Sequence, residues 1–155
     1  IFIHNAVVAV FGNFMEIDPV QLNANFQTNV MGFCYLSRLL APAMVAAGKG
    51  VIIASGNTSA LRGKANFAGF APTKAAQRIF AESMARELGP KGVHVAYVLI
   101  DAMIDLEWTR EWFPDKPTEY FIQPDDIAET TYQIAHQPRS AWSFNVEVRP
   151  FGENW

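Results

Sequence analysis

The chain has 155 residues, of which 50% are hydrophobic, 13% aromatic and 17% charged. That composition supplies one hydrophobic core and excludes an intrinsically disordered chain. Twelve basic and fifteen acidic side chains give a net charge of −3, so the basic footprint of a nucleic-acid-binding protein is missing.

The first part of the chain predicts a strand, a helix and a second strand. Ile1–Val10 is apolar and rich in β-branched residues, which is typical of a strand buried on both faces. Asp18-Pro19 supplies an N-cap and a proline at the first helical position. Apolar residues then recur at helical spacing to about Gly48, and Gly50–Ser55 predicts a second buried strand.

The middle of the chain predicts a long helix. It begins near Phe70–Pro72, where a proline is tolerated in the first turn, and it ends at Gly89-Pro90. Its apolar face is expected to comprise Ala75, Ala76, Ile79, Phe80, Ser83 and Leu88.

The last third predicts a strand, an irregular segment, a helix and a strand. Val93–Ile100 is a buried strand, and 105–118 is irregular or briefly helical. A helix opens at Pro124 and runs to about His136, and Trp142–Val148 alternates as a half-exposed strand does. Strands and helices in this alternation imply an α/β fold, with helices on both faces of a parallel sheet.

Cysteine and hydropathy give further exclusions. The single Cys34 forms no internal disulfide, and the three scattered histidines have no metal-ligand spacing. The longest unbroken apolar run, Ala6–Phe11, is far too short to span a bilayer. We therefore expect one domain over residues 1–155, cytoplasmic and reduced, with no metal, no nucleic acid and no membrane as partner.

Several segments, in this order and spacing, resemble the second half of the short-chain dehydrogenase/reductases. His4-Asn5-Ala6-Val7 stands where that family has its Asn-Asn-Ala-Gly strand end, and Asn29 stands at its helical active-site Asn. Phe70-Ala71-Pro72-Thr73-Lys74 matches the Tyr-xxx-Lys motif, and Ala85–Val95 reads like the family's segment after it. The resemblance implies a Rossmann-like, doubly wound parallel sheet and a nicotinamide cofactor, NAD or NADP.

The family's glycine-rich turn, which holds the cofactor pyrophosphate at a helix N-terminus, has no counterpart in this sequence. The chain also opens inside the expected strand Ile1–Val10, with no initiator Met. We expect the N-terminal half of the fold to be missing from this chain. The strands should then lie in chain order, with Ile1–Val10 at an apolar edge that needs a missing segment or a partner strand.

The resemblance also implies catalytic roles. In the family, the Tyr hydroxyl exchanges a proton with the substrate oxygen, and the Lys lowers the pKa of that Tyr and holds the nicotinamide ribose. A Ser about thirteen residues earlier hydrogen-bonds the substrate, and the Asn anchors a water of the proton relay. Lys74 and Asn29 match this pattern, but Phe70 replaces the Tyr and Asn57 stands at the Ser position.

These departures fall on the proton donor. Phe70 has no proton to give, and the Asn57 amide can hydrogen-bond a carbonyl without acting as an acid. Ser55, or a hydroxyl of the following loop, supplies the missing Ser if the alignment shifts by one or two residues. Lys74, with a lowered pKa, and Asp101 are the alternative donors.

The resemblance places a set of residues against the cofactor. Asp101-Ala102 stands at the family's Pro-Gly, near the nicotinamide end, and Ile104 is where the family binds the carboxamide through its backbone. The cofactor-binding residues expected are Asn5, Ala6, Ser55, Lys74, Asp101 and Ile104. Simpler readings stand beside these roles: Phe70 as a core aromatic, Lys74 as a solvated lysine, Asn29 as a buried structural amide and Asp101 as a turn cap.

We interpret the chain as part of an NAD(P)-dependent oxidoreductase acting on a small carbonyl or alcohol substrate. The alternative is a catalytically inactive binding or oligomerisation module; an unrelated flavodoxin-like protein fits less well. The helices over 27–47 and 70–88 match those that form a dimer interface in many family members. These helices carry more large apolar side chains than one face of the sheet needs for its packing: Phe33, Leu36, Leu40 and Phe80. We therefore expect a homo-oligomer.

The motif also predicts a geometry. The Phe70 ring should occupy the site of the Tyr ring, near Lys74 Nζ and the side chain of Asn57 or Ser55. Without cofactor, Lys74 should bond to water and to Asn29.

Overall fold

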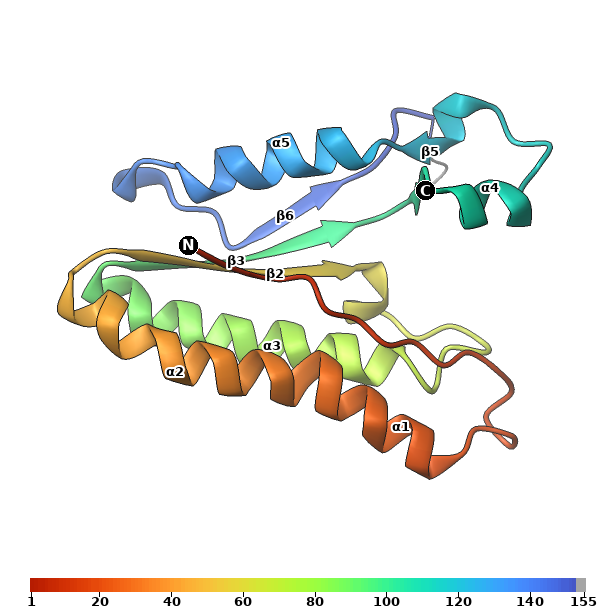
Figure 1. Ribbon diagram of the computed structural model, residues 1–155, viewed down its shortest axis with the longest axis horizontal. Coiled ribbons are helices and arrows are strands. Elements are labelled where there is room, and N and C mark those ends of the chain that lie inside the picture. The colour runs from red at the N-terminus through yellow and green to blue at the C-terminus, as the bar shows by residue number, and fades with distance from the viewer. Residues whose placement is uncertain (153–155) are drawn as a thin grey trace.

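The computed structural model describes residues 1–152, and its centre is a parallel sheet of four strands (Figure 1). The strands follow one another in chain order, β1-β2-β3-β6, so the expected order is confirmed and β1 lies at one edge. Their bounds are β1 Phe2–His4, β2 Gly50–Asn57, β3 Val93–Ile100 and β6 Asn145–Val148.

Helices cover both faces of the sheet, which confirms the doubly wound α/β class. α1 (Pro19–Phe26) continues through a π-helical turn, Gln27–Met31, into α2 (Gly32–Ala46). α2 and α3 (Ala71–Leu88) lie on one face, and α5 (Pro124–Ala135) lies on the other (Figure 1). The predicted helices are therefore all present, with boundaries within a few residues of those expected.

The start of α1 follows the expected chemistry. Asp18 adopts an extended backbone, and its carboxylate accepts a 2.8 Å hydrogen bond from the Val20 N–H, while Pro19 occupies the first helical position. α3 begins after Phe70 and ends before a short 3-10 turn, Gly89–Lys91.

The segment between β3 and α5 holds a small two-stranded parallel sheet that the sequence did not predict. It comprises β4 (Met103–Ile104) and β5 (Phe121–Ile122), with the short helix α4 (Glu107–Trp112) between them. Two-residue strands have no periodicity to read. Further 3-10 turns are Thr58–Ala60, Thr118–Tyr120 and Arg139–Ala141.

An ion pair closes this segment. Both oxygens of Asp105 accept from the Arg110 guanidinium, at 2.6 and 2.8 Å, and Gln123 donates to the same carboxylate at 2.8 Å. These hydrogen bonds, chiefly those from Arg110, lower the pKa of Asp105 to about 2. The segment is therefore tied at its base, while Trp108 and Trp112 of α4 remain exposed.

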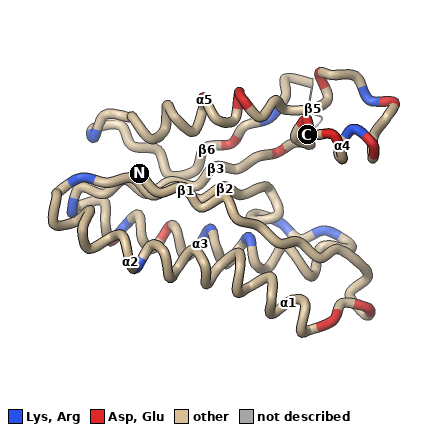
Figure 2. Tube along the Cα trace, in the orientation of Figure 1, with Lys and Arg blue, Asp and Glu red and all other residues tan. Residues whose placement is uncertain are grey.

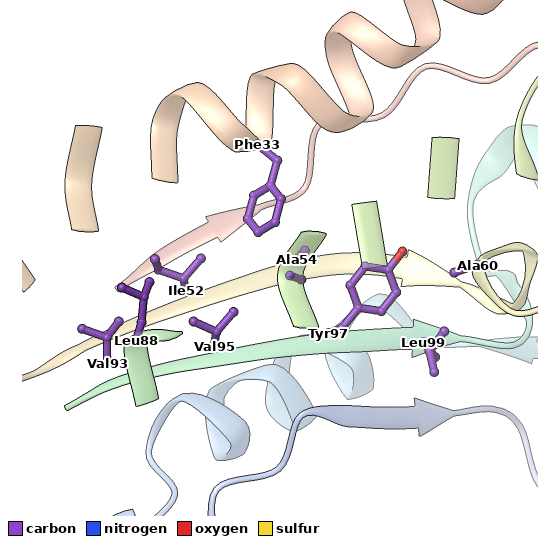
Figure 3. Close-up of a cluster of buried hydrophobic side chains, with 10 residues drawn as sticks. Phe33, Ile52, Ala54, Ala60, Leu88, Val93, Val95, Tyr97 and Leu99 are labelled. Carbon is purple, nitrogen blue, oxygen red and sulfur yellow. The ribbon is translucent and has the colours of Figure 1, made fainter. Parts of the chain in front are cut away.

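Alternation along the strands makes two cores. One lies beneath α2 and α3, and Figure 3 shows Phe33 pointing from its helix toward the sheet, on the face that carries Ile52 and Tyr97. The other joins Ile53 and its neighbours to Ile134 of α5. Phe33 is fully buried in the first core, so its expected place in an oligomer interface is wrong.

β1 is much shorter than predicted. Only Phe2–His4 pairs with β2, whereas the sequence predicts a strand to Val10. The backbone of Val8 instead exchanges two hydrogen bonds with the Asn29 side chain. An amide therefore satisfies the groups that a neighbouring strand would otherwise pair.

The α1–α2 stretch is the one described helix that is long and apolar enough to cross a membrane. Pro19–Ala46 spans 28 residues, with a mean hydropathy of 1.2 in its most apolar window. Length and composition alone do not separate such a helix from the core helix of a soluble fold, and α2 packs on the sheet through Phe33 and Ser37. Figure 2 shows Lys and Arg on α2 and α3 and at both ends of the molecule, whereas α5 carries none.

Gly56 is required by the core. A β-carbon at Gly56 would overlap the Tyr97 phenol, whereas one at Gly63 would meet open space. We expect Gly56→Ala to lower the free energy of unfolding by about 1–3 kcal/mol through overpacking. Urea unfolding measures the change, with Gly63→Ala as the matched control. Equal stability of the two variants would contradict the packing.

Candidate functional site

The predicted site residues converge where the carboxyl ends of β1, β2 and β3 meet. Asn5 follows β1, Ser55–Asn57 end β2, and Asp101 follows β3. This edge is where open parallel sheets bind ligands. Ser55 and Asn5 touch directly, since the Ser55 hydroxyl donates to Asn5 Oδ1 at 2.6 Å.

Asn29 lies fully buried in the π-helical turn, and its side chain is a clamp. Its Oδ1 accepts from the Val8 N–H at 2.9 Å, and its Nδ2 donates to the Val8 carbonyl at 2.8 Å and to Thr73 Oγ1 at 2.9 Å. The Asn29 carbonyl accepts a 2.6 Å hydrogen bond from Gln77 Nε2. Asn29 therefore joins the loop after β1 to α3.

Lys74 is buried, with only 3% of its surface exposed, so the reading of a solvated helix lysine is wrong. Its Nζ donates to the Ser55 carbonyl and to Gln77 Oε1, each at 3.1 Å. Burial lowers the pKa of Lys74 from 10.5 to about 8. The expected bond to Asn29 is not direct, because Gln77 lies between the two residues.

Phe70 stands just before α3, with 4% of its surface exposed. The centre of its ring is 5.9 Å from Lys74 Nζ, as the motif spacing predicts. Its aromatic neighbour is Phe11, with ring centres 5.2 Å apart. The expected proximity of the Phe70 ring to the side chain of Asn57 or Ser55 stays a prediction. Phe70 thus borders the ammonium without a polar atom of its own.

Asn57 and Asp101 organise the loop that follows β2. Asn57 Oδ1 accepts from the Ser59 N–H at 3.0 Å and so caps the turn Thr58–Ala60. Thr58 Oγ1 donates to Asp101 Oδ1 at 2.9 Å, and Arg149 Nη1 lies 3.8 Å from the other carboxylate oxygen. The Asp101 carboxylate is therefore held in place by two partners.

The remaining predicted cofactor residues lie to either side. Ala6 is exposed in the loop after β1. Ile104 belongs to β4, and its carbonyl accepts a 2.5 Å hydrogen bond from Thr109 Oγ1.

The sequence did not indicate two residues that complete the site, Gln77 and Tyr97. The Tyr97 hydroxyl donates to Gln77 Oε1 and to the Lys74 carbonyl, each at 3.3 Å. Burial raises the pKa of Tyr97 well above its usual range. The sequence spacing could have pointed to Gln77, because residues three positions apart in a helix, such as Lys74 and Gln77, lie on the same face.

The donor set suits one end of a nicotinamide cofactor. An ammonium group has three N–H donors, and Lys74 uses two of them within the described residues, which leaves one for a ribose hydroxyl. The Asn57 amide nitrogen and the exposed Asn5 side chain lie at the same edge of the sheet. For the pyrophosphate, the sequence contains no Gly-x-Gly-x-x-Gly turn.

The comparisons with known proteins agree with this geometry. The profile of the family described as "short chain dehydrogenase" matches residues 1–116. The chain belongs to the short-chain dehydrogenase family. It is 30% identical over 125 residues to the 7alpha-hydroxysteroid dehydrogenase of Escherichia coli (strain K12), a match that covers 76% of this chain and 49% of that protein.

Solved structures share the fold. A short-chain dehydrogenase from Rhodopseudomonas palustris is 33% identical, with a TM-score of 0.79 and coverage of 96% of this chain and 61% of the other. A metagenomic short-chain oxidoreductase in complex with NADP is 27% identical, with a TM-score of 0.78 and coverage of 96% and 60%. This chain spans about half the length of the curated relatives it matches.

Burial of Lys74 predicts an alkaline rise in stability. Between about pH 8 and 10, the unfolded chain holds a proton on Lys74 that the folded chain has lost, so the free energy of unfolding rises by about 2 kcal/mol. Above pH 10 the buried Tyr97 opposes it, because the folded chain keeps a phenol proton that the unfolded chain loses. Urea unfolding across this range measures the rise.

Lys74→Met is the matched control, since it keeps the length of the side chain and removes the amine. It should show no rise between pH 8 and 10. A flat profile in the unsubstituted protein would contradict the buried ammonium.

Proposed function

We propose that the full-length protein is an NAD(P)-dependent oxidoreductase that transfers hydride between the cofactor and a small carbonyl or alcohol substrate. The observation that carries the proposal is the buried Lys74 at the carboxyl edge of the sheet. Within the described part of the chain, two of its three donors are hydrogen-bonded and one has no partner. The NADP complex of a 27% identical relative supports a nicotinamide cofactor. We infer that the protein acts in the cytoplasm and needs no metal.

The residues of this chain divide the work. Lys74 would donate to the nicotinamide ribose, and Asn5, Ala6 and the backbone of Ile104 would help to hold the cofactor, which would supply the hydride when bound. The Asn57 amide nitrogen, which has no hydrogen-bond partner among residues 1–152, would hydrogen-bond the substrate oxygen. Asp101 stands beside Asn57 through Thr58 and is the carboxyl group available to move a proton.

Phe70 limits the rate. A general acid contributes about 10²–10⁴-fold to such a reaction, and a phenyl ring supplies no proton. Turnover should therefore be slow beside that of relatives with a tyrosine at this position.

Restoring the hydroxyl tests the site. Phe70→Tyr with Asn57→Ser, made in the full-length protein, should raise carbonyl reduction about 100-fold, because a phenol beside Lys74 regains a general acid. NADH fluorescence measures binding, and NADH oxidation with a panel of aldehydes and ketones measures turnover. Phe67→Tyr is the control, since Phe67 packs on the same Phe11 ring, 4.9 Å away, but lies outside the motif.

The outcomes separate two functions. If the unsubstituted protein turns over carbonyls and Phe70→Tyr adds nothing, another donor such as Asp101 is in use. If neither protein binds NADH, the oxidoreductase proposal fails and the inactive binding module takes its place. The specific observation in favour of that alternative is the apolar contact of Phe70 with Phe11, where a proton donor is expected.

We also propose that the protein is a homodimer through the outer faces of α2 and α3. Leu36, Leu39 and Leu40 are exposed on α2, and Ile79 is exposed on α3. A contiguous apolar surface usually marks an interaction site, and we propose that these side chains form one.

A charge on this surface should separate the subunits. Leu39 is 74% exposed, so Leu39→Glu should not disturb the core but should convert a dimer to a monomer at micromolar concentration. Light scattering coupled to size exclusion measures the mass. Leu61→Glu, at an exposed leucine outside these helices, should leave the mass unchanged. A monomeric unsubstituted protein would refute the dimer.

A further inference from the structure

Gln77 is a fully buried amide between the ammonium of Lys74 and the π-helical turn. Its Oε1 accepts from Lys74 Nζ at 3.1 Å and from the Tyr97 hydroxyl at 3.3 Å. Its Nε2 donates to the Asn29 carbonyl at 2.6 Å. The amide oxygen of Gln77 therefore accepts hydrogen bonds from donors, and its amide nitrogen donates a hydrogen bond to an acceptor.

The chemistry of the two neighbours fixes how this amide is oriented. Lys74 Nζ can only donate, and a backbone carbonyl can only accept. The oxygen of Gln77 must therefore face Lys74 and the nitrogen must face Asn29. A carboxylate at this position would only accept, and an amine would only donate, so a side-chain amide satisfies both partners at once.

No anion balances the ammonium within residues 1–152. The titratable side chains that face it are His4 from β1 and Tyr97 from β3, and Arg78 of α3 lies near Tyr97. Burial, and then Lys74 itself, lowers the pKa of His4 and so favours its neutral imidazole, and burial raises the pKa of Tyr97 and so keeps its phenol protonated. Neither side chain therefore supplies a negative charge near neutral pH. The ammonium therefore depends on two neutral acceptors, the Ser55 carbonyl and Gln77 Oε1.

We propose that Gln77 is the positioning residue of the site: its amide fixes Lys74 Nζ against the end of β2 and ties it to the carbonyl of Asn29. The Ser55 carbonyl is part of the backbone of β2, so it cannot move with the Lys74 side chain. Together with the Ser55 carbonyl, Gln77 sets the direction of the one remaining donor of Lys74, and it supports the charged form of the lysine. Its consequence for cofactor binding rests on the proposed function, whereas the effect on Lys74 does not.

Two substitutions at Gln77 should move the titration of Lys74 in opposite directions. Gln77→Leu removes the acceptor, so Lys74 should lose its proton about one pH unit lower. Gln77→Glu places a carboxylate beside the ammonium and should raise the pH of that titration. The Lys74 Cε resonance in ¹³C-lysine-labelled protein follows the titration, and Lys74→Met assigns the signal.

Matched controls separate positioning from simple packing. Gln133→Leu makes the same exchange at an exposed position of α5 and should leave the Lys74 titration unchanged. Tyr97→Phe keeps the ring and removes the other donor to Gln77 Oε1, so it should not lower the titration. Circular dichroism confirms that each variant is folded, and Gln77→Glu, of nearly the same size, gives the result if Gln77→Leu does not fold.

Cofactor binding by the full-length protein gives the second readout. Gln77→Leu should raise the NADH dissociation constant about tenfold and the KM for NADH in parallel. If no protein binds NADH but the two Gln77 variants shift Lys74 oppositely, the oxidoreductase proposal fails and the positioning role stands. If folded Gln77 variants titrate Lys74 as the unsubstituted protein does, or both shift it in the same direction, the positioning role is overturned.

Discussion

The buried ammonium of Lys74 is the constraint on which the site depends. Removing an amine from water disfavours its charged form. In this site the ammonium is stabilised by two neutral hydrogen-bond acceptors and not by a carboxylate. The Ser55 carbonyl comes from the last three residues of the strand β2, and Gln77 comes from the same helix as the lysine. The end of β2 and the first two turns of α3 must therefore keep a fixed distance and orientation to one another.

The π-helical turn is the second part of that constraint. Widening the helix at Gln27–Met31 places Asn29 so that its side chain holds Val8 and Thr73 while its carbonyl faces Gln77. Each such hydrogen bond contributes about 0.5–1.5 kcal/mol net, but an orphaned buried partner costs more. The same clamp ends β1 early, so a local widening of one helix sets both the length of the edge strand and the position of the site.

The sequence predicts the fold well and the site only in part. The long periodic helices and the buried strands β2 and β3 are predicted because their patterns extend over many residues, and the Tyr-xxx-Lys spacing places Phe70 beside Lys74. The expected apolar face of α3 included Ile79, which is exposed, whereas the buried stripe contains Thr73, Lys74 and Gln77. Apolar periodicity cannot find a helix face whose buried members are polar, because each is stable only with partners from distant segments.

Phe70 and Gln77 both lie near the ammonium of Lys74, and they differ in whether they can accept a hydrogen bond from it. A phenyl ring attracts a cation weakly at about 6 Å, and the Phe70 ring lies 5.9 Å from Lys74 Nζ. It therefore contributes little against desolvation, and it offers no lone pair. Gln77 Oε1, one helical turn beyond Lys74, offers one at 3.1 Å. The lysine can thus remain buried and oriented at a site that has no phenol beside it.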